Sequence, residues 1–243
     1  MSRGPVIYLE AYTVRRIPYT EDSCMLSLLS REQGLTSALW KVPATRRRRP
    51  GAPQEPQTFS LLRATLQRGG EDIARLRSFE ELPGSYRFDQ QDRYLLLCLL
   101  ARATLLTVTR SPQEGQVFDL WQTCAGPAQQ EKLALLDLLA GLHAVHGTWP
   151  LPGRCEECGH ALRGKAVLAG WRLLCGACAP PPRQELAGAE LVWLQGSSAT
   201  RPACTAETAR RLEKFLALRL PGNLGSDWIF SRIMEQWDKE RQT

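Results

Sequence analysis

Four of the eight cysteines form two Cys-x-x-Cys pairs, Cys155 with Cys158 and Cys175 with Cys178. Sixteen residues separate the pairs, a spacing typical of zinc ribbons, in which each tight knuckle turn supplies two thiolate ligands. Four thiolates complete a tetrahedral coordination sphere and leave no position for a catalytic water. We therefore predict one structural Zn²⁺ per chain, bound by Cys155, Cys158, Cys175 and Cys178.

Two alternatives to this metal site are a pair of redox-active Cys-x-x-Cys motifs and a set of unrelated buried thiols. His160 lies close to the first pair and is a competing ligand, but with four cysteines present we expect it at the surface. The remaining cysteines are expected to be small buried hydrophobic residues, and they are Cys24, Cys98, Cys124 and Cys204.

The sequence lacks the motifs of common catalytic centres. It contains no Gly-x-Ser-x-Gly, no His-Glu-x-x-His and no dinucleotide-binding fingerprint. Residues 159–166 are close to a nucleotide-binding P-loop, but Ala166 stands where a Ser or Thr must bind magnesium. Three histidines leave few candidates for a general base at neutral pH. We therefore expect that the protein is not an enzyme.

The excess positive charge lies in the first third of the chain. The 243 residues include 31 Lys and Arg against 25 Asp and Glu, a formal net charge of +6. Residues 1–78 hold 13 basic and 7 acidic residues, so the remainder is neutral. This asymmetry indicates that the N-terminal part binds a polyanion such as a nucleic acid.

Aromatic residues are interleaved with these cations. A small barrel with cations along a groove and aromatic platforms is typical of single-strand binding. We place Trp40 nearest to a ligand, and we expect Tyr8 and Phe59 in the core. The arginine run 46–49 has the alternative interpretation of a solvated loop. The candidate DNA-binding residues are Arg15, Arg16, Arg31, Trp40, Lys41, Arg46, Arg47, Arg48 and Arg49.

The N-terminal part has the periodicity of short strands. Apolar and β-branched runs at 6–15, 24–30, 35–42, 58–67 and 72–82 predict five strands, and hence a small barrel or sandwich. The segment that begins at Arg31 predicts a turn, with Gly34 at the position that tolerates a positive φ. Residues 43–56 contain four prolines and predict a loop.

Beyond residue 83 the periodicity becomes helical. Helices are predicted near 90–106, 118–124, 126–147, 206–220 and 226–237, with Thr205 capping the fourth. We therefore expect an α+β chain with a basic β domain at 1–82, a helical domain at 83–149 and 201–243, and the four-cysteine insert at 150–200. No secretory or membrane segment is visible, which predicts a cytoplasmic protein.

The chain resembles the bacterial RecO family of recombination mediators over essentially its whole length. The similarity is carried by segments 10–15 and 28–37, by Lys41 followed by the arginine run, by the four-cysteine insert and by the last helix. Many relatives read Ala-Lys-Gly-Ala-Arg-Arg where this chain reads Trp-Lys-Val-Pro-Ala-Thr-Arg-Arg at 40–47. The loop after the third strand therefore lacks the family's glycine.

This resemblance implies a five-stranded OB-fold, an all-α domain and an inserted zinc-ribbon-like module. It implies a DNA repair protein of RecF-type gap repair that binds single- and double-stranded DNA and anneals complementary strands. The implied partners are RecR and the acidic C-terminal tail of single-strand-binding protein, with RecA loaded indirectly. The implied location is the cytoplasm, at the nucleoid and away from membranes.

Two other functions stay open at this point. The first is an RNA-associated protein, because an OB-fold with cations binds RNA equally well. The second is an interaction hub, in which the neutral helical domain recruits protein partners. In the hub hypothesis the apolar stripe of the last helix matters most, although core packing is its more ordinary role; the stripe consists of Ile229, Phe230, Ile233, Met234 and Trp237.

Overall fold

The computed structural model describes residues 4–41, 55–68, 73–83, 91–107, 115–125, 135–149, 153–162, 165–169, 172–181, 184–186, 188–196, 205–220, 232 and 235. Contacts group the chain into two compact units, Met1–Leu133 and Ala134–Thr243. The three-part domain division expected from the sequence stays a prediction, because this grouping does not decide whether residues 83–149 and 201–243 form one domain.

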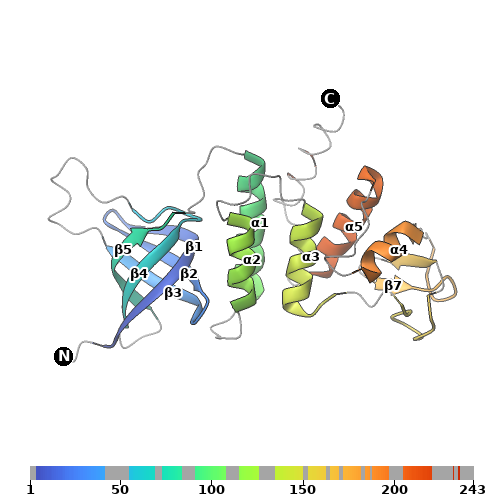
Figure 1. Cartoon of the computed structure of the whole chain (residues 1–243), viewed down its shortest axis with the longest axis horizontal. Coiled ribbons are helices and arrows are strands. Elements are labelled where there is room, and N and C mark those ends of the chain that lie inside the picture. Colours follow the sequence, from blue (N-terminus) through green and yellow to red (C-terminus); the bar gives the residue numbers. More distant parts are fainter. Residues whose placement is uncertain are drawn as a thin grey trace. The chain divides into compact units, whose positions relative to one another are not determined.

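Five strands of the first unit close into a barrel in the order β1-β2-β3-β5-β4 (Figure 1). They are β1 (Val6–Thr20), β2 (Ser23–Ser30), β3 (Gly34–Lys41), β4 (Leu61–Arg68) and β5 (Ala74–Glu81). The barrel closes because the long strand β1 pairs with β4 through its first half and with β2 through its second half. β3 and β5 pair in parallel, and the other neighbours are antiparallel. Of the two folds that the sequence left open, barrel and sandwich, the structure shows the barrel.

Local residues explain where the strands begin and end. Gly34 has a φ of 59°, which confirms the predicted turn, because only glycine adopts this conformation at no steric cost. Phe59 has a φ of 69°, and β4 therefore begins at Leu61 and not at residue 58. The barrel interior is filled by small and branched side chains around Trp40, and its core members include Leu9, Ala11, Leu26, Ala38, Leu62 and Leu76.

Two helices pack against the barrel within the first unit, α1 (Gln91–Thr107) and α2 (Gly115–Ala125). Aromatic rings make this contact. The ring of Tyr12 on β1 lies 5.4 Å from the ring of Phe118 and 5.5 Å from that of Trp121. The ring of Phe59 lies 5.9 Å from Trp121. This aromatic cluster covers one part of the outer barrel surface.

The second unit combines helices with a small sheet of order β7-β6-β8. Its elements are α3 (Leu135–His146), β6 (Ala166–Ala169), β7 (Arg172–Leu174), β8 (Gln184–Leu186), α4 (Gly188–Gln195) and α5 (Ala206–Arg219). The predicted cap of α5 is confirmed, since the backbone N–H of Thr208 donates to the Thr205 hydroxyl at 3.2 Å. His143 of α3 is wholly buried, and its Nε2 lies 2.8 Å from the carbonyl oxygen of Leu216 on α5.

The predicted α+β class, with a five-stranded domain followed by helices, is confirmed. No helix in the described ranges is long and apolar enough to cross a membrane. Several sequence predictions lie outside the described residues. These are the arginine run 46–49, Cys204 and the apolar stripe of the last helix.

Candidate metal centre and nucleic-acid interface

Two knuckle turns bring the four predicted cysteine ligands together. In the first, the N–H of Gly159 donates to the carbonyl of Cys155 at 2.9 Å, and Gly159 has a φ of 72°. In the second, the N–H of Cys178 donates to the carbonyl of Cys175 at 3.1 Å. Cys175 directly follows strand β7, and the N–H of Glu156 donates to the carbonyl of Leu173 on that strand at 2.9 Å. This last bond holds one knuckle against the other.

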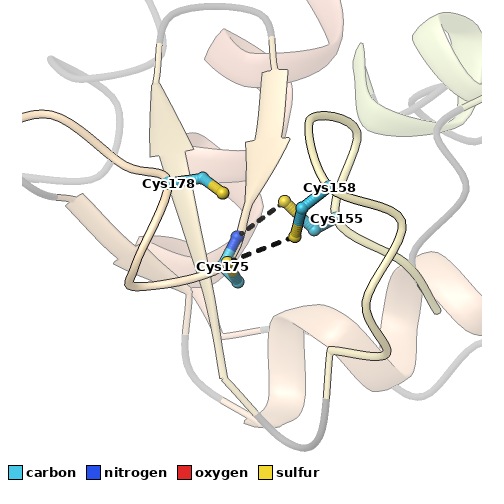
Figure 2. A group of neighbouring side chains, drawn as sticks. All are labelled: Cys155, Cys158, Cys175 and Cys178. Carbon is cyan, nitrogen blue, oxygen red and sulfur yellow. Dashed lines mark hydrogen bonds between the residues drawn. The ribbon is translucent and has the colours of Figure 1, made fainter.

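The four sulfur atoms all lie within 4.8 Å of one another (Figure 2). A metal with metal–sulfur bonds of about 2.3 Å in a tetrahedron separates its sulfurs by about 3.8 Å. The sulfurs of Cys158 and Cys175 are 3.8 Å apart. All four cysteines are free thiols, without a disulfide between them. The cluster therefore fits a single metal ion with four sulfur ligands.

The electrostatics of the cluster also favour a cation. Burial by itself raises the pKa of Cys155, but backbone N–H groups from Cys158 and Cys175 outweigh burial and lower that pKa to about 6. The N–H of Cys175 lies 3.2 Å from the sulfur of Cys155. The nearby sulfurs of Cys175 and Cys158 raise the pKa of Cys178 to about 12. Four thiolates this close repel one another, and a bound cation removes the repulsion.

The surroundings hold the cluster in place. His160, the competing ligand, has its Nδ1 3.2 Å from the sulfur of Cys158, as a hydrogen-bond partner of that sulfur. Glu156, inside the first knuckle, accepts a hydrogen bond from Nη1 of Arg219 on α5 at 2.7 Å. Their side chains are only 18% and 13% exposed. Sequence reasoning missed this pair, because 63 residues separate its members and no local pattern connects them.

Arg15 and Lys41, two of the predicted DNA-binding residues, lie on the open outer surface of the barrel. Arg15 stands opposite Ser27 of β2, and Lys41 stands opposite Ser23. Both cations are exposed. Arg75 of β5 joins them on this surface, opposite Leu39 of β3. Within the described part of the chain none of these three cations has an acidic partner.

We call this surface the open face and define it by the outward rows of β1, β2, β3 and β5. Its members are Arg15, Ile17, Met25, Ser27, Ser37, Leu39, Lys41 and Arg75. Arg75 was absent from the sequence candidates. The alternation of β5, in which Ala74 and Leu76 enter the core, is the signal that identifies its outward position.

Arg16 and Arg31 have partners within the protein. Arg16 stands opposite the core residue Leu26, and its guanidinium pairs with Glu55. Arg31 pairs with Asp119 of α2, and its guanidinium carbon lies 5.4 Å from the centre of the Phe118 ring. Arg31 therefore connects the barrel to α2 and stands apart from the open face.

Trp40 lies in the barrel core. Its side chain is 2% exposed, and its ring meets that of Phe79 edge-on at 5.2 Å. Stacking on a base requires an accessible ring face, so we leave Trp40 out of the proposed interface. Tyr8, which the sequence placed in the core, is 78% exposed, and Tyr19 is also exposed.

No family model matches the sequence, and no curated protein is significantly similar to it.

Proposed function

We propose that the protein is a DNA-binding recombination mediator of the RecO type that acts in single-strand gap repair. It binds single- and double-stranded DNA, anneals complementary strands and helps RecA load onto strands coated by single-strand-binding protein. The observation that carries this proposal is the open face, on which Arg15, Lys41 and Arg75 have no acidic partner among the residues that the structure describes. Free cations on a barrel surface are what the phosphates of a nucleic acid bind.

The strand order supports the assignment of the barrel as an OB-fold. Five strands that close as β1-β2-β3-β5-β4 fit its Greek-key arrangement, and OB-folds bind oligonucleotides over strands two and three. The open face includes the outward rows of β2 and β3. Annealing on such a face is stoichiometric, because cations that screen two strands lower their repulsion and no covalent bond changes. The proposal therefore needs no enzymatic activity.

The proposed partners follow from the same assignment. They are RecR and the acidic tail of single-strand-binding protein, with RecA reached indirectly, and the proposed location is the nucleoid. A basic N-terminal part beside a neutral remainder is compatible with nucleic acid on the barrel and protein partners elsewhere.

We further propose that the metal is Zn²⁺, one per chain, and that its role is structural. Thiolate-only tetrahedral sites are typical of structural zinc. When bound, the ion supplies folding free energy to the insert. Metal analysis of the purified protein tests this assignment, and a zinc content well below one equivalent contradicts it.

The salt dependence of DNA binding tests the proposed function. Anisotropy titrations with a labelled single strand at several salt concentrations give the slope of log K against log salt. Each phosphate contact contributes about −0.7 to this slope for single strands. We expect the triple variant Arg15→Gln, Lys41→Gln, Arg75→Gln to lose about 2 from the magnitude of the slope.

The matched control is Arg63→Gln. Arg63 is an exposed barrel arginine, but it already pairs with Glu10 at 3.1 Å and with Glu80 at 3.5 Å. Its replacement should leave the slope unchanged. A wild-type affinity that does not depend on salt refutes the DNA-binding function. A strong preference for RNA over DNA of matched sequence turns the assignment toward the RNA-associated alternative.

A further inference from the structure

Three apolar side chains form one continuous row across the open face. Ile17 of β1 stands opposite Met25 of β2, and Met25 stands opposite Leu39 of β3. Directly opposite residues on one face of a sheet lie about 5 Å apart, so the row spans about 10 Å. Ile17 is 40% exposed, and Met25 and Leu39 are half-buried. These three side chains are not part of the barrel core, because the core consists of residues from the inward rows.

Cations stand on both sides of this row. Arg15 lies two residues before Ile17 and Lys41 lies two residues after Leu39, which places each about 7 Å along its strand. Arg75 is directly opposite Leu39 and extends the row by one strand. An apolar row bordered by unpaired cations fits a ligand that carries both flat apolar groups and closely spaced negative charges.

We propose that this row, Ile17, Met25 and Leu39, is a platform for unpaired bases and makes the open face a single-strand site. The inference rests on the proposed function, since it assumes that DNA binds there. A single strand offers its bases and its phosphates together, whereas a duplex offers phosphates and keeps its bases stacked inside. The duplex therefore gains only the contacts with the cations.

The platform is aliphatic, and this sets its selectivity. Every base has an apolar face, and a flexible Met side chain adapts to faces of different size. On the Arg15 side, the outward neighbours of the row on β2 and β3 are Ser27 and Ser37, whose small hydroxyl side chains leave space above the sheet. The platform consequently distinguishes single-stranded from duplex DNA, and it discriminates only weakly among the four bases.

Acidic residues limit the platform at one end. Glu21 and Asp22 occupy the turn between β1 and β2, beyond the Thr20–Ser23 pair and thus on the Lys41 side of the row. They repel phosphates beyond Lys41. The favourable path for a strand therefore runs along the row between Lys41 and Arg15 toward Arg75, and ends before the turn.

Methionine methyl groups give a direct test in the unaltered full-length protein. The chain has three methionines, at positions 1, 25 and 234, so a sample labelled with ¹³C at the methionine methyls gives a readily assigned spectrum. We expect the Met25 resonance to shift when oligo(dT) is added and to stay in place with a duplex of equal length. If the Met25 resonance does not shift at saturating oligo(dT), the proposal that the row contacts bases is wrong.

A variant separates the platform from the cations. We expect Met25→Ser with Leu39→Thr to weaken oligo(dT) binding several-fold, because two of the three apolar side chains that contact the bases are removed. Its duplex affinity and its salt slope should stay at wild-type values. Val192→Ser is the matched control, because it removes an exposed apolar side chain from the second unit.

The outcomes are distinguishable. If the cation variant loses salt slope while the platform variant binds both DNA forms normally, the platform is wrong and the DNA-binding function stands. Equal losses on both forms also overturn the platform. If wild-type protein binds no DNA, the proposed function itself fails. If an acidic peptide with apolar side chains shifts Met25 and oligo(dT) does not, the row is a peptide site and the inference is wrong.

Discussion

Lowering the pH should destabilise the second unit through His143. This histidine is wholly buried between α3 and α5. Its Nε2 faces the carbonyl of Leu216 at 2.8 Å and its Nδ1 faces the hydroxyl of Thr148 at 2.8 Å. A carbonyl only accepts, so Nε2 carries the proton and Nδ1 accepts from Thr148. In the neutral ring both nitrogens have a suitable partner. In the charged ring Nδ1 also carries a proton, so the Thr148 hydroxyl must change from donor to acceptor.

The magnitude follows from the pKa. Burial is the main cause that lowers the pKa of His143 from 6.5 to about 4. Below pH 6.5 His143 becomes protonated in the unfolded chain but stays neutral in the folded chain. The unfolding free energy is therefore at its full value above pH 6.5 and falls as the pH approaches 4. Each pKa unit corresponds to 1.36 kcal/mol, and the loss is therefore about 3 kcal/mol by pH 4. This is a large fraction of the usual 5–15 kcal/mol.

Hydrogen exchange at several pH values measures this loss by region. Opening free energies of peptides from α3 and α5 should fall between pH 6.5 and 4 by about 3 kcal/mol more in wild-type protein than in His143→Gln. Glutamine can donate to Leu216 and accept from Thr148, yet it does not titrate. His146→Gln is the control, because His146 is also in α3 and is less buried. The same pH dependence in wild type and His143→Gln refutes the reasoning.

Three further predictions concern the ion pairs and the metal centre. Arg219→Met leaves the partly buried Glu156 without its partner and should cost about 1–3 kcal/mol of unfolding free energy, measured by denaturant titration. Adding Glu156→Gln should restore part of the loss, and no recovery contradicts a direct pair. Arg31→Ala should cost on the order of 1 kcal/mol, because its pair with Asp119 is half-exposed, and a changed DNA salt slope would place Arg31 at the interface. Cys155→Ser should abolish stoichiometric metal binding and lower the melting temperature of the second unit; retention of one metal ion per chain disproves the four-cysteine site.

Features set by neighbouring residues were predictable from the sequence. The turn at Gly34, the cap at Thr205 and the two cysteine knuckles each depend on side chains and backbone groups within about four positions. The five-strand pattern was visible for the same reason, since alternation within a strand is a local signal. These features account for the barrel elements and for the position of the metal centre.

The direction of each side chain on β1 was not predictable. The register shifts between Thr13 and Arg15, and a one-residue slip moves every later side chain to the opposite face. Arg15 consequently faces outward, while Arg16 stands opposite a core residue. Trp40 and Lys41 differ in the same way on β3. Chemistry alone groups Arg15 with Arg16, and Trp40 with Lys41, as ligands of DNA. In the structure the two members of each pair lie on opposite faces of the sheet.

Pairing, and not the number of cations, decides which part of a basic barrel can bind DNA. The excess charge of the first 78 residues counts Arg16, Arg31 and Arg63 equally with Arg15, but the first three already have carboxylate partners. A phosphate that replaced one of those carboxylates would gain one ion pair and break another, so the net gain in binding is small. An unpaired arginine releases no partner and gives the full gain from counterion release. The open face is therefore a part of the described barrel where positive charge is available to a ligand. Arg68 and Arg77 also lack a carboxylate partner among the described residues, but their guanidinium groups already donate to the side chains of Gln33 and Gln67.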